Sequence, residues 1–267
     1  MEHILIDDGT EVAYRDLGSG RPLVLIHGLG IEGRIWEYQM AALTDQFRLI
    51  VPDLRGHGQS DKPAEGYALE TLTNDIEAIV SELDREDVIL VGWSLGGYIG
   101  TIYAARTPSA LDRLVIVGSG VVHWGSDPDV ESTYSLDLAA AADQRRDGRP
   151  SAERVFVERI FTEDVNEDTK EWVWDLVLET PLYASVALLN ALDGMSRETW
   201  RERLASIEVP TDIFHGAYDD AAPTHVAEHV VEDILPAGEF LLFEDSGHLP
   251  FIEESERFND RLRGLGP

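Results

Sequence analysis

The chain has 267 residues, of which 43% are hydrophobic, and this length is sufficient to bury a substantial core. It contains no cysteine, which excludes disulfides, thiolate metal sites and a cysteine nucleophile. Acidic residues number 51 against 21 Lys and Arg, and the resulting formal charge of −30 excludes nucleic acids and anionic membranes as expected partners.

The hydropathy of the chain and its first eight residues indicate where the protein is located in the cell. No segment approaches the roughly 18 consecutive apolar residues of a membrane span. Residues 1–8 are acidic and lack the basic-then-apolar layout of a signal peptide. We therefore expect a cytoplasmic protein without membrane association, and its oligomeric state stays open.

The first third of the chain alternates short apolar runs with helical patterns. Asp8-Gly9 favours a tight turn, and the run Leu23-Val24-Leu25-Ile26 is typical of a strand buried on both faces. The predicted strands are 2–7, 11–16, 23–27 and 49–51, and the predicted helices are 35–47 and 69–83.

The alternation continues to residue 120, stops, and resumes near residue 195. Strands that alternate with helices predict an α/β fold with a mostly parallel sheet covered on both faces. We expect 1–120 and 195–267 to form this core and 121–194 to form a helical cap over the edge where the strands end. The predicted strands are 88–91, 114–117, 211–214 and 239–243, and the predicted helices are 95–106, 151–161, 169–179, 182–192, 224–234 and 254–265.

The segment Gly92-Trp93-Ser94-Leu95-Gly96 carries the clearest chemical signal. It has the spacing G-x-S-x-G and lies between a predicted strand and a predicted helix. A sharp strand-to-helix turn exposes the serine oxygen above the sheet, and the glycines permit close approach of neighbouring backbone. Free N–H groups at the helix N-terminus can bind a developing negative charge. Ser94 is therefore a candidate nucleophile.

Two later segments complete a chain order typical of one enzyme family. Asp219 ends His215-Gly216-Ala217-Tyr218-Asp219, and His248 ends Asp245-Ser246-Gly247-His248. Upstream, a predicted strand leads into His27-Gly28-Leu29-Gly30. With the order Ser, Asp, His, the chain resembles the α/β-hydrolases over nearly its whole length. The resemblance implies a mostly parallel, eight-stranded sheet with helices on both faces and a helical cap insertion.

The resemblance also implies roles for individual residues. Ser94 is the nucleophile, His248 the base, and Asp219 the acid that orients the histidine. The backbone N–H groups of Leu29 and Leu95 form the oxyanion hole. Other carboxylates remain alternatives for the acid, one adjacent and two after an earlier strand: Asp220, Asp127 and Asp129.

Aromatic residues beside the motif and in the expected cap are candidate walls of the acyl pocket. Aromatic residues on helices more often form a helical core, so both interpretations stay open. The candidates are Trp93, Trp124, Trp172, Trp174 and Tyr183.

The remaining histidines are expected to be structural. His27 braces the oxyanion loop, His57 lies between two glycines, and His215 packs under the acid loop. The segment His225-Val226-Ala227-Glu228-His229 fits the H-x-x-E-H zinc signature. It falls on a predicted surface helix near the end of the chain, so we expect two exposed histidines and no metal.

These residues predict a serine hydrolase that needs no cofactor and cleaves a small carboxylic ester or lactone through an acyl-enzyme. The strand-to-helix turn around Ser94 also resembles that of pimeloyl-carrier methyl ester carboxylesterases. The negative field favours neutral substrates over acyl-CoA. The alternatives on the same triad are a lactonase, a C–C bond hydrolase and a cofactor-free haloperoxidase or perhydrolase. A ligand-binding receptor with slow turnover is the alternative of another class.

The acidic surface predicts that the melting temperature rises from low to multimolar KCl. Only Lys62 and Lys170 are lysines, and the charge of −30 favours a halophilic origin. Added salt screens the repulsion between carboxylates in the folded chain. Thermal unfolding followed by circular dichroism across a KCl series measures the effect. A melting temperature that stays constant or falls would indicate a merely acidic protein.

Overall fold

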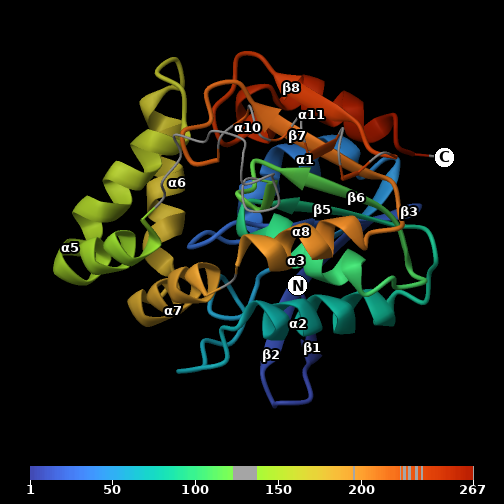
Figure 1. Ribbon diagram of the computed structural model, residues 1–267, viewed down its shortest axis with the longest axis horizontal. Helices are drawn as coiled ribbons and strands as arrows, with labels where there is room; N and C mark the ends of the chain where they lie inside the picture. Colours follow the sequence, from blue (N-terminus) through green and yellow to red (C-terminus); the bar gives the residue numbers. More distant parts are fainter. Residues whose placement is uncertain are drawn as a thin grey trace.

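Eight strands form one sheet in the computed structural model, which describes residues 1–122, 137–194, 196–222, 224, 227, 230–231, 234–235 and 237–266. The strands are β1 (Glu2–Leu5), β2 (Glu11–Gly18), β3 (Arg21–Ile26), β4 (Phe47–Pro52), β5 (Val88–Trp93), β6 (Leu111–Val117), β7 (Thr211–Gly216) and β8 (Phe240–Phe243). Their spatial order is β1-β2-β4-β3-β5-β6-β7-β8 (Figure 1). The pairs β1–β2 and β2–β4 are antiparallel, and all other pairs are parallel, which confirms the predicted fold class.

Helices cover both faces of the sheet (Figure 1). The sequence of the central strand β5 is continuously apolar because both of its faces are buried. Val88 and Leu90 join the core on one face of the sheet, and Ile89 and Val91 join the core on the other. The first core includes α2 (Leu69–Glu82), α3 (Leu95–Ala105) and α8 (Arg197–Ala205). The second includes α1 (Glu37–Leu43), α10 (Pro250–Glu253) and α11 (Ser255–Arg263).

One predicted helix differs from the structure, and one helix of the structure has no predicted counterpart. The predicted helix 35–47 is a 3-10 turn η1 (Gly33–Trp36) followed by the short α1, because Phe47 already pairs with Arg21 in the sheet. Helix α8 was not predicted, since only Trp200 and Leu204 of its residues are buried. Most of the predicted helix 224–234 lies outside the described residues.

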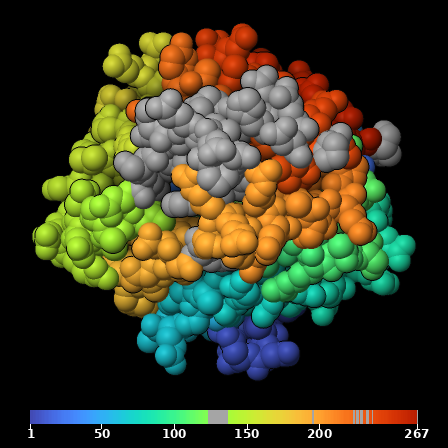
Figure 2. Space-filling model, in the orientation of Figure 1, coloured from blue at the N-terminus to red at the C-terminus, as the bar shows by residue number. Residues whose placement is uncertain are grey.

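Three helices between β6 and β7 lie together at one end of the molecule (Figure 1). They are α5 (Leu138–Ile160), α6 (Glu167–Glu179) and α7 (Leu182–Asp193). Helices α6 and α7 agree closely with the predicted helices 169–179 and 182–192, whereas α5 begins well before the predicted helix 151–161. Helix α5 is interrupted at Gly148, two residues before Pro150, and forms one side of the surface in Figure 2.

In the described ranges no single helix is long and apolar enough to cross a membrane. Helices α6 and α7 reach that length and composition only as a pair, which is bent by 92° at the break between them.

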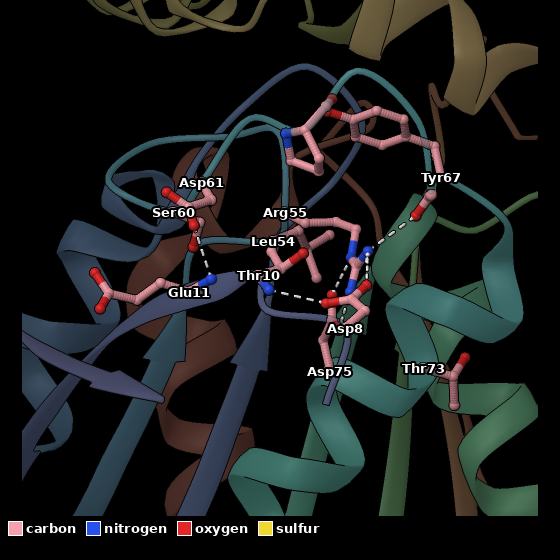
Figure 3. A network of polar contacts seen from close by, with 12 residues as sticks. Asp8, Thr10, Glu11, Leu54, Arg55, Ser60, Asp61, Tyr67, Thr73 and Asp75 are labelled. Atoms are coloured by element: carbon pink, nitrogen blue, oxygen red, sulfur yellow. Dashed lines mark hydrogen bonds and ion pairs between the residues drawn. The ribbon is translucent and has the colours of Figure 1, made fainter. Parts of the chain in front are cut away.

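A buried arginine fixes the loop that joins β4 to α2 (Figure 3). Arg55 is 1% exposed, and its Nε and Nη2 each donate to a carboxylate oxygen of Asp75 over 2.6 Å. Its Nη1 donates to Asp8 in the turn after β1 (2.9 Å) and to the carbonyl of Gly66 (3.3 Å). One guanidinium thus joins the β1–β2 hairpin, the loop and helix α2.

We predict that Asp75→Ala lowers the free energy of unfolding by about 3–5 kcal/mol, since it leaves the Arg55 charge buried without its main partner. Urea titration measures the change. The matched control is Asp87→Ala, which breaks a half-exposed pair with Arg85 and is expected to have a much smaller effect. Equal losses in both variants would contradict the role given to Arg55.

Candidate active site

Ser94 stands at a sharp turn between β5 and α3. Its backbone is in the left-handed region, with φ 53° and ψ −111°. A side chain at position 92 would lie 2.2 Å from the carbonyl oxygen of Gly96, so the two ends of the turn can meet only because residue 92 is a glycine. The Ser94 N–H donates to the Val117 carbonyl of β6 over 2.9 Å. The turn therefore holds the serine above the end of the sheet.

His248 and Asp219 meet at the same edge from two different loops. The Nδ1 of His248 lies 2.9 Å from Oδ2 and 3.1 Å from Oδ1 of Asp219. The backbone N–H groups of Ala221 and Ala222 each donate to Oδ1 over 2.8 Å. Burial on its own raises the pKa of Asp219, but the charge and hydrogen bond of His248 bring the pKa below its usual value. The carboxylate is thus ionised and directed at the histidine, whereas the neighbouring Asp220 is exposed.

The backbone of His248 is held by contacts that the sequence did not predict. Its N–H donates to the Ile160 carbonyl at the end of α5, and its carbonyl accepts from the indole Nε1 of Trp93, both over 2.9 Å. Next to it, Glu253 accepts hydrogen bonds from the N–H of Gly247 (2.9 Å) and from the N–H (3.0 Å) and hydroxyl (2.7 Å) of Thr162. Burial raises the pKa of Glu253. No sequence pattern distinguishes this glutamate from the acidic residues around it.

His215 packs beneath the Asp219 loop, as its sequence position suggests. Its Nε2 lies 2.6 Å from the Ala222 carbonyl and 3.3 Å from Oδ2 of Asp219. Burial lowers the pKa of His215, so the neutral ring donates its Nε2–H to that carbonyl. Among the described residues its Nδ1 has no partner. The contact supports the loop that carries Asp219.

Two neutral histidines brace the loop at Leu29. The N–H of Leu54 donates to Nε2 of His27 (2.9 Å), and the N–H of Gly30 donates to Nε2 of His57 (3.1 Å). Each Nε2 accepts, so each ring carries its proton on Nδ1, where His27 meets the Gly28 carbonyl and His57 meets the Arg55 carbonyl. Burial lowers the pKa of His27 to about 4 and that of His57 to about 3.

Ser94 and His248 line one cavity of about 140 Å³. Leu29 lies in the same wall, and the first residue of α3, Leu95, follows Ser94 directly. The rest of the described wall is mainly apolar and comes largely from α5 and α7. It includes Leu138, Val155, Phe156, Ile160, Leu189 and Leu192.

The aromatic residues predicted for the pocket lie elsewhere, as far as the structure describes them. Trp93 is buried against the His248 ring, with centroids 5.4 Å apart. Trp172 and Trp174 pack against the second core, and Trp174 stacks under a guanidinium. Tyr183 donates its hydroxyl to the Lys62 carbonyl and lines a separate surface hollow. These side chains follow the packing of their own helices, which the sequence pattern does not relate to the cavity.

Other sequence candidates lie outside the described residues. They are Trp124, the alternative acids Asp127 and Asp129, and the histidines and glutamate of the segment His225-Val226-Ala227-Glu228-His229. In the part of the chain that the structure does describe, no group of three His, Asp or Glu side chains is placed to hold a metal.

The buried histidines predict that stability falls as the pH is lowered from about 6.5 towards 4. In this window the unfolded chain protonates its histidines, whose pKa is then about 6.5, while folded His27 and His57 stay neutral. Each contributes a slope of about 1.4 kcal/mol per pH unit. In His57→Gln we expect the slope of unfolding free energy against pH to be shallower by that amount, because carboxylates titrate equally in both proteins. Parallel slopes in urea titrations of the two proteins would contradict this.

Comparison with known proteins places the chain in a family. Residues 21–255 match the family described as alpha/beta hydrolase fold. The AB hydrolase superfamily protein YisY of Bacillus subtilis is 33% identical, with 97% of each chain covered. The pimeloyl-acyl-carrier-protein methyl ester esterase of Vibrio cholerae is 32% identical, with 92% of this chain and 94% of the relative covered. An esterase structure from Exiguobacterium antarcticum superposes with a TM-score of 0.90 at 30% identity and covers 98% of this chain and 97% of its own. The chain therefore belongs to the α/β-hydrolase family and is a hydrolytic enzyme.

Proposed function

We propose that the protein is a serine esterase that cleaves small carboxylic esters through an acyl-enzyme. Ser94 is the nucleophile, His248 the base and Asp219 the acid. One observation carries the proposal: a serine at a strand-to-helix turn and a histidine bonded to a buried carboxylate line the same small cavity.

The chemistry follows from the protonation states in the site. Asp219 accepts the Nδ1–H of His248 and leaves Nε2 as the basic atom. In the reaction, Nε2 takes the Ser94 proton as the serine oxygen attacks the ester carbonyl, and returns it to the departing alcohol. Water, deprotonated by the same nitrogen, then releases the acid and frees the serine. The net reaction is ester plus water to acid plus alcohol.

We assign the stabilisation of the negative charge that develops on the ester carbonyl oxygen to the backbone N–H groups of Leu29 and Leu95. Leu95 is the first residue of α3, where N–H groups have no acceptor within the helix. Leu29 lies in the cavity wall, on the loop that His27 and His57 hold in place. Removing one such donor typically lowers kcat about 100-fold or more, so a fixed loop is important for the rate.

The cavity limits the acyl group, and segment 121–194 is proposed as the cap that encloses it. A volume of about 140 Å³ is close to that of an apolar cavity which holds benzene (~150 Å³), so acyl groups of about six carbons or fewer should fit. The contribution of α5 and α7 to the wall supports this role for the segment.

Hydrolysis of p-nitrophenyl esters of increasing acyl length tests the proposal. We expect an optimum at about six carbons or fewer, because longer chains exceed the cavity. Ser94→Ala should lower kcat about 10⁴-fold or more, since it removes the attacking oxygen. Equal rates for wild type and Ser94→Ala would refute the nucleophile. Negligible turnover by the wild type would instead favour a receptor.

A matched pair of variants tests the acid. We expect Asp219→Asn to lower kcat by about 10⁴-fold, because an amide favours the wrong histidine tautomer. Asp220→Asn serves as the control, as its side chain is the exposed neighbour of the same type. The reverse order of effects would assign the role to Asp220.

A further inference from the structure

The walls of the Ser94 cavity have a charge that the composition does not predict. Acidic residues outnumber Lys and Arg by 51 to 21 in the sequence. Yet the described wall includes two arginines, Arg145 and Arg159, and no aspartate or glutamate. Both arginines belong to α5. The charged side chains of the described wall are therefore opposite in sign to the net charge of the molecule.

Arg145 is a buried and oriented cation. Its Nε donates to Oε1 of Glu153 over 3.0 Å, and its Nη2 lies 3.0 Å from Oε2. Arg149 shares the same carboxylate, with its Nε 3.6 Å away. Two guanidinium groups thus share one carboxylate, which leaves positive charge in excess beside the cavity.

Arg159 has no carboxylate partner among the residues that the structure describes. Its Nη2 donates to the backbone carbonyl of Asp220 over 2.9 Å, which holds the side chain near the acid loop. Within the described ranges its guanidinium forms no ion pair. Its other N–H groups are available to a ligand at the cavity wall.

We propose that the preferred substrate is a short ester that also carries a carboxylate, bound by Arg159 with the support of Arg145. This inference rests on the esterase function proposed above. A guanidinium recognises a carboxylate through two parallel N–H···O bonds. Because the cavity has a volume of only about 140 Å³, a substrate that fits it carries its carboxylate and its ester carbonyl on one short chain. The substrate class is therefore the half esters of short dicarboxylic acids or the acyl esters of short hydroxy acids.

Two isosteric pairs of esters test the proposal and separate these two sources of the carboxylate. Monomethyl glutarate is compared with methyl 5-methylhexanoate, in which an isopropyl group replaces the carboxylate on the acyl side. The 4-acetoxybutanoate anion is compared with 4-methylpentyl acetate, which makes the same replacement on the alcohol side. Base uptake at constant pH gives kcat/KM for each ester. We expect the charged member of at least one pair to be preferred by about tenfold or more.

Variants of α5 connect the preference to Arg159. Arg159→Gln should lower the charged-to-neutral ratio about tenfold, and Arg159→Lys should lower it less, because the charge remains without the planar fork. Arg154→Gln is the matched control: Arg154 lies on the same helix, but its guanidinium stacks 4.8 Å from the Trp174 ring centroid. Arg159 also contacts the acid loop, and any disturbance of that loop affects both members of a pair and cancels in the ratio.

The outcomes separate this inference from the function on which it rests. Hydrolysis with ratios below one in both pairs overturns the inference and leaves the esterase function standing. The same conclusion follows if Arg159→Gln and Arg154→Gln change the charged-to-neutral ratio equally. If the wild type hydrolyses none of the four esters, the esterase function and the inference fail together.

Discussion

The contact between the two glycines that flank the Ser94 turn is the constraint on which the site depends. A side chain at position 92 would approach the Gly96 carbonyl, and one at position 96 would lie 2.5 Å from the Ile26 carbonyl of β3. With neither side chain present, α3 begins directly at the end of β5, and Ser94 can keep its φ of 53°. The parallel strands β3, β7 and β8 end at the same edge of the sheet, and the loops of Leu29, Asp219 and His248 follow them there.

That constraint explains how far the sequence could predict the site. Ser94 and Asp219 each follow an apolar strand, and carboxyl ends of parallel strands share an edge, so their proximity is predictable from strand order alone. The position of Arg159 cannot be predicted in this way, because it depends on how α5 packs against the core. The helical period of α5 relates its residues only to one another. The pocket role expected for Trp172 and Trp174 depended on packing in the same way. Both side chains belong to α6 and pack against the second core, and they do not line the cavity.

The molecule separates its charges by environment. Exposed carboxylates give the surface its negative charge, whereas the described cavity wall carries arginines and the loop behind it is held by buried histidines. His27 and His57 stay uncharged behind the loop of Leu29, and Asp219 stays ionised beside His248. Defined protonation states keep each donor and acceptor in a single role, which a network of titrating groups could not do.

The hydrogen bond from the His248 N–H to the Ile160 carbonyl joins the proposed base to the end of α5, which forms part of the cavity wall. Glu253 adds a second connection, because it joins Thr162, just after α5, to Gly247 beside the histidine. A bulky substrate that displaces the end of α5 therefore also displaces the imidazole. In the proposed esterase reaction, selection by size then acts on the alignment of the proton transfer as well as on the fit of the acyl group, so an oversized ester is processed slowly even once it is bound.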